Sequence, residues 1–294
     1  MIHRRGRFGV AVTASIVHCS GSPTVIVKTE SCRRTVRSVD TKWGSAPARR
    51  EVEPVTRTAP RTPRRRLLTQ QWRDLTFVHW PVAPEIVAPL LPPGTTPDIH
   101  DGTSWVGLVA FRMWRIGIGR TPGLPYLGTF PETNVRLYSV DGSGRRGVVF
   151  RSLEAGRLAP VVAARSLFRL PYMWGAMSIE RNGDVISYRS RRRWPRDQGR
   201  PASRLSVRIG PRVEQPTPLD DFLTARWGLH NRRYGRTTYQ PNVHPAWPLH
   251  RAKVLDLDDE LVQAAGLPGP LGAPASVLFS PGVPVWFGPP EAGV

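Results

Sequence analysis

The chain has 294 residues, enough for one large domain or two small ones, and carries 42 Lys and Arg against 22 Asp and Glu. Both cysteines, Cys19 and Cys32, precede residue 67, so the remainder contains no disulfide, thiol nucleophile or thiolate metal ligand. No stretch approaches the roughly 18 uninterrupted apolar residues that a membrane span requires, and we therefore expect a soluble, cytoplasmic protein.

The excess positive charge is concentrated in the first 66 residues. They hold 15 Lys and Arg against 4 Asp and Glu, and they show no sustained apolar period. Such a segment buries too little apolar surface to offset its ordering entropy. We therefore expect residues 1–66 to form a disordered basic tail and residues 67–294 to form one folded domain. Only 3 of the 42 basic residues are Lys, a skew that fits GC-rich coding better than selection of Arg for phosphate recognition.

From residue 72 onward, short apolar runs alternate with Gly, Pro and Asn, a pattern typical of an antiparallel sheet. Asn182-Gly183 predicts a tight hairpin in which both turn positions need positive φ. The pattern of residues 275–287 predicts two strand halves around Ser280-Pro281-Gly282. The other predicted strands are residues 75–80, 104–116, 133–140, 147–155, 174–181, 185–192 and 204–209.

Four short helices are predicted from their ends. They cover residues 84–91, residues 160–168, a segment with Thr217 as N-cap and Pro218 at the first helical position, and residues 258–265. The fold class expected is therefore mainly β (α+β), a large antiparallel sheet or barrel with a few short helices.

Motifs for metal binding or hydrolysis are missing from the domain. It contains no Gly-x-Ser-x-Gly nucleophile turn, and its histidines form no His-x-His or His-Glu-x-x-His arrangement. We expect no metal and no cofactor. The histidines concerned are His79, His100, His230, His244 and His250.

A basic run with aromatic ends, residues 188–194, could track a nucleic-acid backbone. On a strand, alternation would place Arg189, Arg191 and Arg193 on one face and Arg192 on the other. A solvated strand end is a commoner explanation of this pattern than a binding stripe.

Three segments of the chain stand out: RDLTFVHW at residues 73–80, FPETNVR at residues 130–136 and SPGVPVW at residues 280–286. They resemble the signature stretches of the YqjF-like bacterial family, which is usually placed in the acetoacetate decarboxylase-like superfamily. The resemblance implies an acetoacetate decarboxylase-like antiparallel β-barrel. It begins only near residue 67, which favours an over-called start codon as the origin of residues 1–66.

The resemblance also implies a set of site residues. Glu132 and Tyr172 are the candidate catalytic groups, because a buried carboxyl would carry a raised pKa and a phenol can donate to a bound oxygen. Arg73 matches the superfamily's substrate-facing arginine and could clamp a carboxylate. Because side chains alternate along a strand, Asn134 and Arg136 should share the face of Glu132, and Trp174 would form an apolar wall; these three complete the expected ligand-binding set.

The superfamily's Schiff-base lysine is missing, since its position reads Leu170-Pro171-Tyr172-Met173. The resemblance therefore implies binding of a small polar or acidic organic molecule in an internal cavity, without Schiff-base decarboxylation. Two alternatives stay open: an enzyme of unknown reaction, lyase or hydrolase type, using Glu132 and Arg73, or a basic protein that binds nucleic acid or an acidic partner. The resemblance points away from nucleic acid, and the sequence leaves homo-oligomer formation open.

Overall fold

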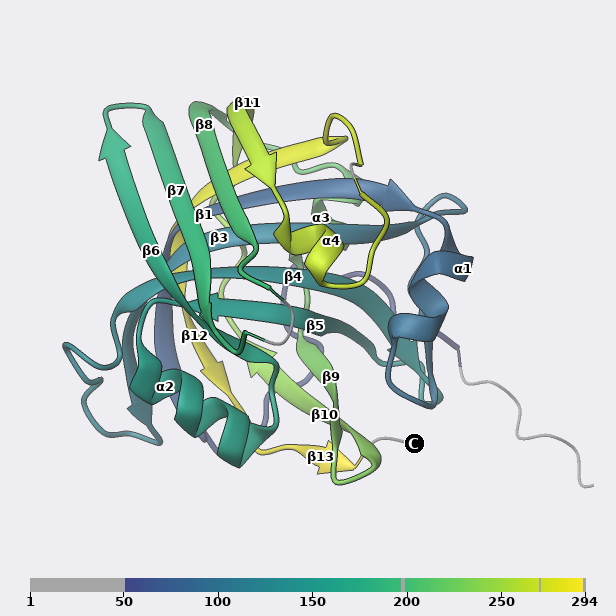
Figure 1. The fold of residues 1–294 in the computed structure, drawn as a ribbon. Coiled ribbons are helices and arrows are strands. Elements are labelled where there is room, and N and C mark those ends of the chain that lie inside the picture. Colours follow the sequence, from purple (N-terminus) through teal and green to yellow (C-terminus); the bar gives the residue numbers. More distant parts are fainter. Residues whose placement is uncertain (1–50, 197–198, 270, 293–294) are drawn as a thin grey trace, which may run out of the picture. The chain divides into compact units, whose positions relative to one another are not determined.

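The computed structural model describes residues 51–196, 199–269 and 271–292, in which thirteen strands belong to one sheet (Figure 1). The strands are β1 (Leu68–Val82), β2 (Thr95–Pro97), β3 (Ser104–Ile118), β4 (Phe130–Asp141), β5 (Arg146–Ala155), β6 (Tyr172–Asn182), β7 (Val185–Trp194), β8 (Ala202–Arg212), β9 (Gly228–Arg233), β10 (Arg236–Val243), β11 (His250–Asp259), β12 (Ser276–Phe287) and β13 (Glu291–Ala292). The predicted mainly β fold class is confirmed.

The sheet closes on itself because β5 and β12 each pair with three other strands. One edge of β5 pairs with β4, and the other edge is divided between β6 and β9. β12 likewise pairs with β1 on one edge, and with β11 and β10 on the other. Two rings of strands therefore share β12, β1, β3, β4 and β5. In Figure 1, β6, β7, β8 and β11 lie side by side, and β9, β10 and β13 form a separate group.

Most positions of β3, β4 and β5 are buried. Because side chains alternate along a strand, both faces of these strands therefore pack against a core. One face packs into a core that includes Val78, Leu108 and Leu137 together with residues of β7 and β8. The opposite face carries Phe77 and Phe130 in a second core, which continues into a third core beside the helix that follows β8. The candidate site lies on this opposite face.

The helices are short, as their sequence ends predict. They are α1 (Pro84–Val87), α2 (Leu158–Ala163), α3 (Pro218–Thr224) and α4 (Leu261–Ala264), with a 3-10 turn at Ala88–Leu90 and a π turn at Ala164–Phe168. The Thr217 side chain accepts from the Asp220 backbone, and the Asp220 carboxylate accepts from the Thr217 backbone, which completes a capping box. The predicted N-cap is confirmed. α4 begins later than predicted because residues 258 and 259 still pair with β8.

Two predicted strand features need correction. The hairpin between β6 and β7 is present, but its two loop residues are Gly183 and Asp184, since Asn182 pairs with Val185. Gly183 takes φ +60°, the conformation a two-residue loop needs at its first position. The C-terminal run is one strand, β12, which pairs with β1 along most of its length.

Residues 51–66, which the sequence assigns to a disordered tail, contact the sheet. The Glu53 amide donates to Gly144 O, and Trp227 Nε1 donates to Thr56 O at 2.9 Å. Arg57 forms an ion pair with Asp221 of α3 at 2.8 Å. These contacts attach residues 51–66 to the sheet, although their composition predicts disorder. The rest of the predicted tail, residues 1–50, lies outside the described residues.

Candidate functional site

Strand β4 carries a row of polar side chains into the protein interior. Glu132, Asn134 and Arg136 alternate along the strand and are only 3%, 4% and 8% exposed. Their neighbours on β3 and β5 are largely apolar: Phe111 and Ala155 lie beside Glu132 in the register, and the side chains beside Asn134 are also aliphatic. Because all three are buried, a solvated strand face is excluded. The interior here is polar at its centre and apolar around it.

Glu132 and Tyr172 meet in this interior. The Tyr172 hydroxyl donates to Glu132 Oε2 at 3.0 Å, although the first belongs to β6 and the second to β4. Burial raises the pKa of Glu132 to about 8, against the lowering effect of hydrogen bonds from Tyr172 and Asn134. Burial and the neighbouring Glu132 raise the pKa of Tyr172 well above 10. Both groups are therefore mainly neutral at pH 7, and a protonated Glu132 has a hydroxyl to donate.

Asn134 leaves one hydrogen-bonding position open beside this pair. Its Oδ1 is buried and has no hydrogen-bond partner among the described residues. An unpaired buried acceptor costs about 1–3 kcal/mol, so a donor from water or a bound molecule would be favourable there.

Arg136 is a buried cation held by neutral groups. Its Nε donates to the Tyr138 hydroxyl at 3.1 Å and its Nη2 to Leu223 O at 2.9 Å, and its guanidinium lies 5.4 Å from the Phe77 ring centroid. No carboxylate within the described ranges lies within ion-pair distance of it. A buried charge without a counter-charge is costly, so the interior beside Arg136 favours an anion.

His79 belongs to the same network, and the sequence analysis did not select it as a site residue. Its Nε2 lies 2.6 Å from the Tyr138 hydroxyl, while its Nδ1 is buried without a partner. Burial lowers the pKa of His79 well below 6.5, and the charges of Arg136 and Arg226 lower it further, so the ring is neutral. A lone histidine in an apolar strand offers no spacing signal; only its place in RDLTFVHW could have marked it.

Gly107 allows this network to form. It pairs with His79 on β1 and with Arg136 on β4, which places it between the two side chains. A Cβ at this position would lie 2.8 Å from His79 Nε2 and 3.3 Å from Arg136 Cγ. The close approach of the three strands therefore requires glycine.

The structure does not bring Arg73 to this site. Arg73 is exposed, donates to the Gln71 side chain and stacks over the Trp114 ring at 4.2 Å. Its orientation results from a β-bulge: between Arg73 and Thr76, β1 has two residues where β3 has one, and Asp74 takes φ +51°. The bulge reverses the alternation, so Trp72 instead of Arg73 packs against the core that contains Phe77.

Trp174 lies at a hollow next to the interior row. Ala155 of β5 pairs with Glu132 on one side and with Trp174 of β6 on the other. The hollow measures about 420 Å³, and Glu132 is not among its lining residues. They are Gly156, Arg157, Leu158, Trp174, Gly175, Ala176, Met177 and Arg193.

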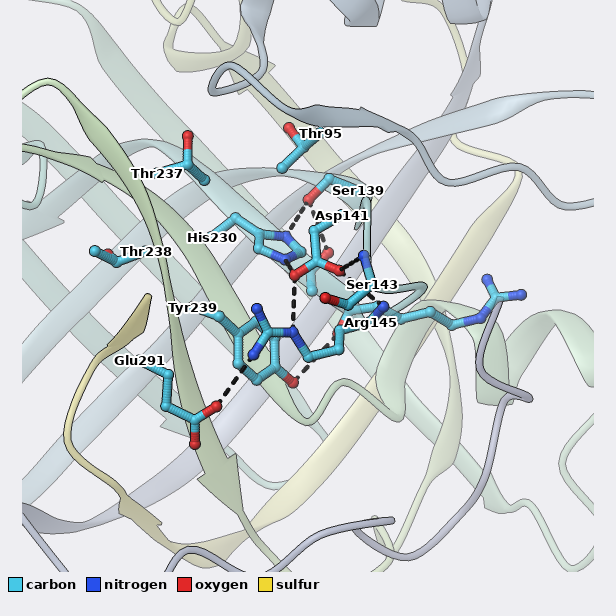
Figure 2. Close-up of polar contacts among 12 residues, drawn as sticks. Thr95, Ser139, Asp141, Ser143, Arg145, His230, Thr237, Thr238, Tyr239 and Glu291 are labelled. Carbon is cyan, nitrogen blue, oxygen red and sulfur yellow. Dashed lines mark hydrogen bonds and ion pairs between the residues drawn. The ribbon is translucent and has the colours of Figure 1, made fainter. Parts of the chain in front are cut away.

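A second polar cluster contains a serine, a histidine and an aspartate (Figure 2). Ser139 Oγ lies 2.8 Å from His230 Nδ1, and His230 Nε2 lies 3.4 Å from Asp141 Oδ2. The second contact is too long for a well-formed hydrogen bond. All three side chains are buried, so no substrate reaches Ser139 in this conformation.

The surroundings of Asp141 give this cluster a structural role. Burial acts to raise the pKa of Asp141, but His230 and hydrogen bonds from Arg145 outweigh it and hold the pKa well below its usual range. Arg145 also pairs with Glu291 at 3.1 Å (Figure 2). The cluster therefore ties the β4–β5 hairpin to β9 and β13. The sequence did not predict it, because Ser139 and His230 are 91 residues apart.

The basic run of β7 divides as alternation predicts. Arg189, Arg191 and Arg193 are exposed, whereas Arg192 is buried and pairs with Glu154 at 2.5 Å, with both side chains fully inaccessible. Arg192 therefore forms an interior ion pair and is not available to a ligand at the surface. This weakens the interpretation of the run as a nucleic-acid stripe.

Residues 69–284 match the DUF2071 family, whose description is "Uncharacterized conserved protein". The chain belongs to this family. It is 30% identical over 208 residues to the uncharacterized protein YqjF of Bacillus subtilis (strain 168), a match that covers 71% of this chain and 85% of YqjF. The family inferred from the three signature stretches is therefore confirmed.

Solved structures place the DUF2071 fold beside that of acetoacetate decarboxylase. The enzyme from Legionella pneumophila is 12% identical, with a TM-score of 0.53 over 90% of this chain and 98% of its own. An acetoacetate decarboxylase-like enzyme from Sphingomonas wittichii RW1 is 11% identical, with a TM-score of 0.50 over 78% and 94%. At these identities the likeness establishes the fold alone.

Two further observations concern the described part of the chain. It contains no helix that is both long and apolar enough to cross a bilayer. Nor does it contain a group of three or more His, Cys, Asp and Glu side chains placed to hold a metal ion.

Proposed function

We propose that this DUF2071 protein binds a small acidic organic molecule in the interior beside β4. Glu132, Asn134, Arg136 and Tyr172 would form the binding site, and Arg73 would not. The observation that carries this proposal is the buried Arg136 guanidinium, which bonds only neutral oxygens and lies on the same strand face as the Glu132–Tyr172 pair.

Each group has a distinct task in this proposal. Arg136 supplies the positive charge that a carboxylate requires, and the protonated Glu132 donates a hydrogen bond to a second oxygen of the ligand. Asn134 Oδ1 accepts from a ligand hydroxyl or from an ordered water. The apolar side chains around this row contact the carbon atoms.

The test is a binding screen of small monocarboxylates, including keto and hydroxy acids, on the full chain by isothermal titration calorimetry. Loss of one hydrogen bond that involves a charged group costs about 1.5–3 kcal/mol, so Arg136→Lys, which cannot make the two-pronged contact, should weaken binding by about tenfold or more. Glu132→Gln removes the donated proton and should weaken binding less. Arg73→Gln is the matched control and should leave the affinity unchanged.

The proposal fails if no acid in the screen binds. It also fails if Arg73→Gln weakens binding as much as Arg136→Lys does, because the anion would then be held at the surface.

The raised pKa of Glu132 favours a second candidate, an enzyme that uses Glu132 as general acid or base. Schiff-base chemistry does not belong to this candidate, because Tyr172 occupies the lysine position and Lys253, the one lysine after residue 42, is exposed on β11. Incubation of the acids that bind with wild type and with Glu132→Gln, followed by mass spectrometry, tests it. Turnover by wild type alone supports an enzyme, and no turnover supports a binding protein.

A further inference from the structure

A second anion site is suggested by the hollow beside α2, outside the interior row. Its walls come from the start of α2, from β6 and from the end of β7, and its volume of about 420 Å³ falls within the range of small-molecule sites. Neither Asp nor Glu lines it.

Two arginines of the hollow are held by aromatic rings. The Arg157 guanidinium lies 4.2 Å from the Tyr126 ring centroid, and the Arg193 guanidinium lies 5.2 Å from that of Trp174. No described carboxylate lies within ion-pair distance of either. Each ring attracts the guanidinium beside it without neutralising its charge.

Arg157 also has an unused donor. Its Nε is buried and finds no hydrogen-bond partner among the described residues. An unpaired buried N–H is costly, so a carboxylate that reaches this donor would be favoured.

Besides the two arginines, the side chains that line the hollow belong to apolar residues. Trp174, Ala176 and Met177 line one side, and Leu158 lines the other. An anion with a carbon body would cover these side chains, whereas a small inorganic ion would leave them in contact with water.

We infer that the hollow lined by Arg157, Arg193 and Trp174 binds an organic carboxylate. The two guanidinium groups would take the carboxylate, and Trp174 and Met177 would contact the carbon body. This site is separate from the proposed interior site and does not depend on it.

The experiment is calorimetric titration of the full chain with acetate, butyrate, benzoate and naphthoate, each compared with its uncharged amide. We expect at least one carboxylate with a large apolar body to bind at least tenfold more tightly than its amide. Arg157→Gln and Arg193→Gln should each weaken that binding by about tenfold, the loss expected for one charge-assisted hydrogen bond.

Two control variants distinguish binding in this hollow from binding elsewhere on the protein. Arg189→Gln removes an exposed charge from the same strand, β7, and should change the affinity less than twofold. Glu132→Gln removes a group of the interior row, and in this background Arg157→Gln and Arg193→Gln should still each weaken binding by about tenfold.

Three results would overturn the inference. The first is that no carboxylate binds more tightly than its amide. The second is that Arg189→Gln weakens binding as much as Arg193→Gln does. The third is that Glu132→Gln abolishes binding that Arg157→Gln leaves intact. The last result would assign the ligand to the interior site and leave the proposed function standing.

Discussion

At the scale of single residues, Glu132 departs most from the ordinary chemistry of its type. It is a carboxyl enclosed by apolar neighbours, with a phenol as its hydrogen-bond donor and a pKa of about 8. Near pH 7 it is mostly a neutral acid, and above pH 8 it becomes a buried anion. Binding of an acidic molecule would therefore be favoured below pH 8.

This pKa predicts how folding stability depends on pH. Because the folded pKa lies above the unfolded value of about 4.5, the folded protein holds the proton more tightly, and stability falls as pH rises from about 4.5 to about 8. The loss attributable to Glu132 should be on the order of a few kcal/mol. Urea unfolding at pH 5 and pH 8 measures it, with Glu132→Gln as the control that lacks this pH term. Equal pH dependence in the two proteins would contradict the assignment.

Sequence reasoning reached part of the site at this scale. Alternation correctly predicted that Glu132, Asn134 and Arg136 share one face, because β4 runs without a bulge of its own through these residues. Arg73, which was chosen because it matches the superfamily's arginine, lies outside this interior because a bulge in β1 lies beside it. His79 and His230 were missed because their partners, Tyr138 and Asp141, come from distant parts of the chain.

At the scale of elements, strands with apolar alternation were predictable and polar strands were not. β3, β4 and β5 show clear apolar runs. β9 and β10 carry arginines, threonines and a proline, and β11 carries acidic and basic residues along much of its length, so local pattern could not identify them. These strands form because β5, β8 and β12 offer unpaired edges, a property of the assembled sheet.

The capping box of α3 gives a prediction at this scale. Thr217→Ala removes the side-chain acceptor of the Asp220 amide and should lower the free energy of unfolding by about 1 kcal/mol. Thr217→Ser keeps the hydroxyl and should retain most of the stability. Chemical denaturation of the two variants provides the comparison, and a loss of equal size in both would assign the effect to packing of the threonine methyl group.

At the scale of the whole molecule, the segment of residues 51–66 contributes to the fold although its composition predicts disorder. It supplies the backbone acceptors of two side chains from the sheet domain: Thr56 O accepts from Trp227, and Glu53 O accepts from Arg146 at 2.6 Å. Composition could not reveal this, because the segment contributes backbone groups and charges and few apolar side chains.

Removal of this segment should therefore destabilise the domain. A chain that starts at residue 67 leaves Trp227 Nε1 and Arg146 Nε without these partners, and it should unfold at lower denaturant concentration than a chain that starts at residue 51. Each lost bond is worth about 1 kcal/mol, so a difference of about 2 kcal/mol or more is expected. Equal midpoints for the two chains would show that the segment contributes nothing to stability.

The most direct test of the central claim is a pH titration of the Glu132 side-chain carboxyl by 13C NMR, with Glu132→Gln to assign its signal. A pKa of about 8 that shifts when an acidic ligand from the screen is added would support a neutral, ligand-facing acid in the interior. A pKa near 4.5 that no ligand alters would show that Glu132 is solvated, and it would contradict the proposed site.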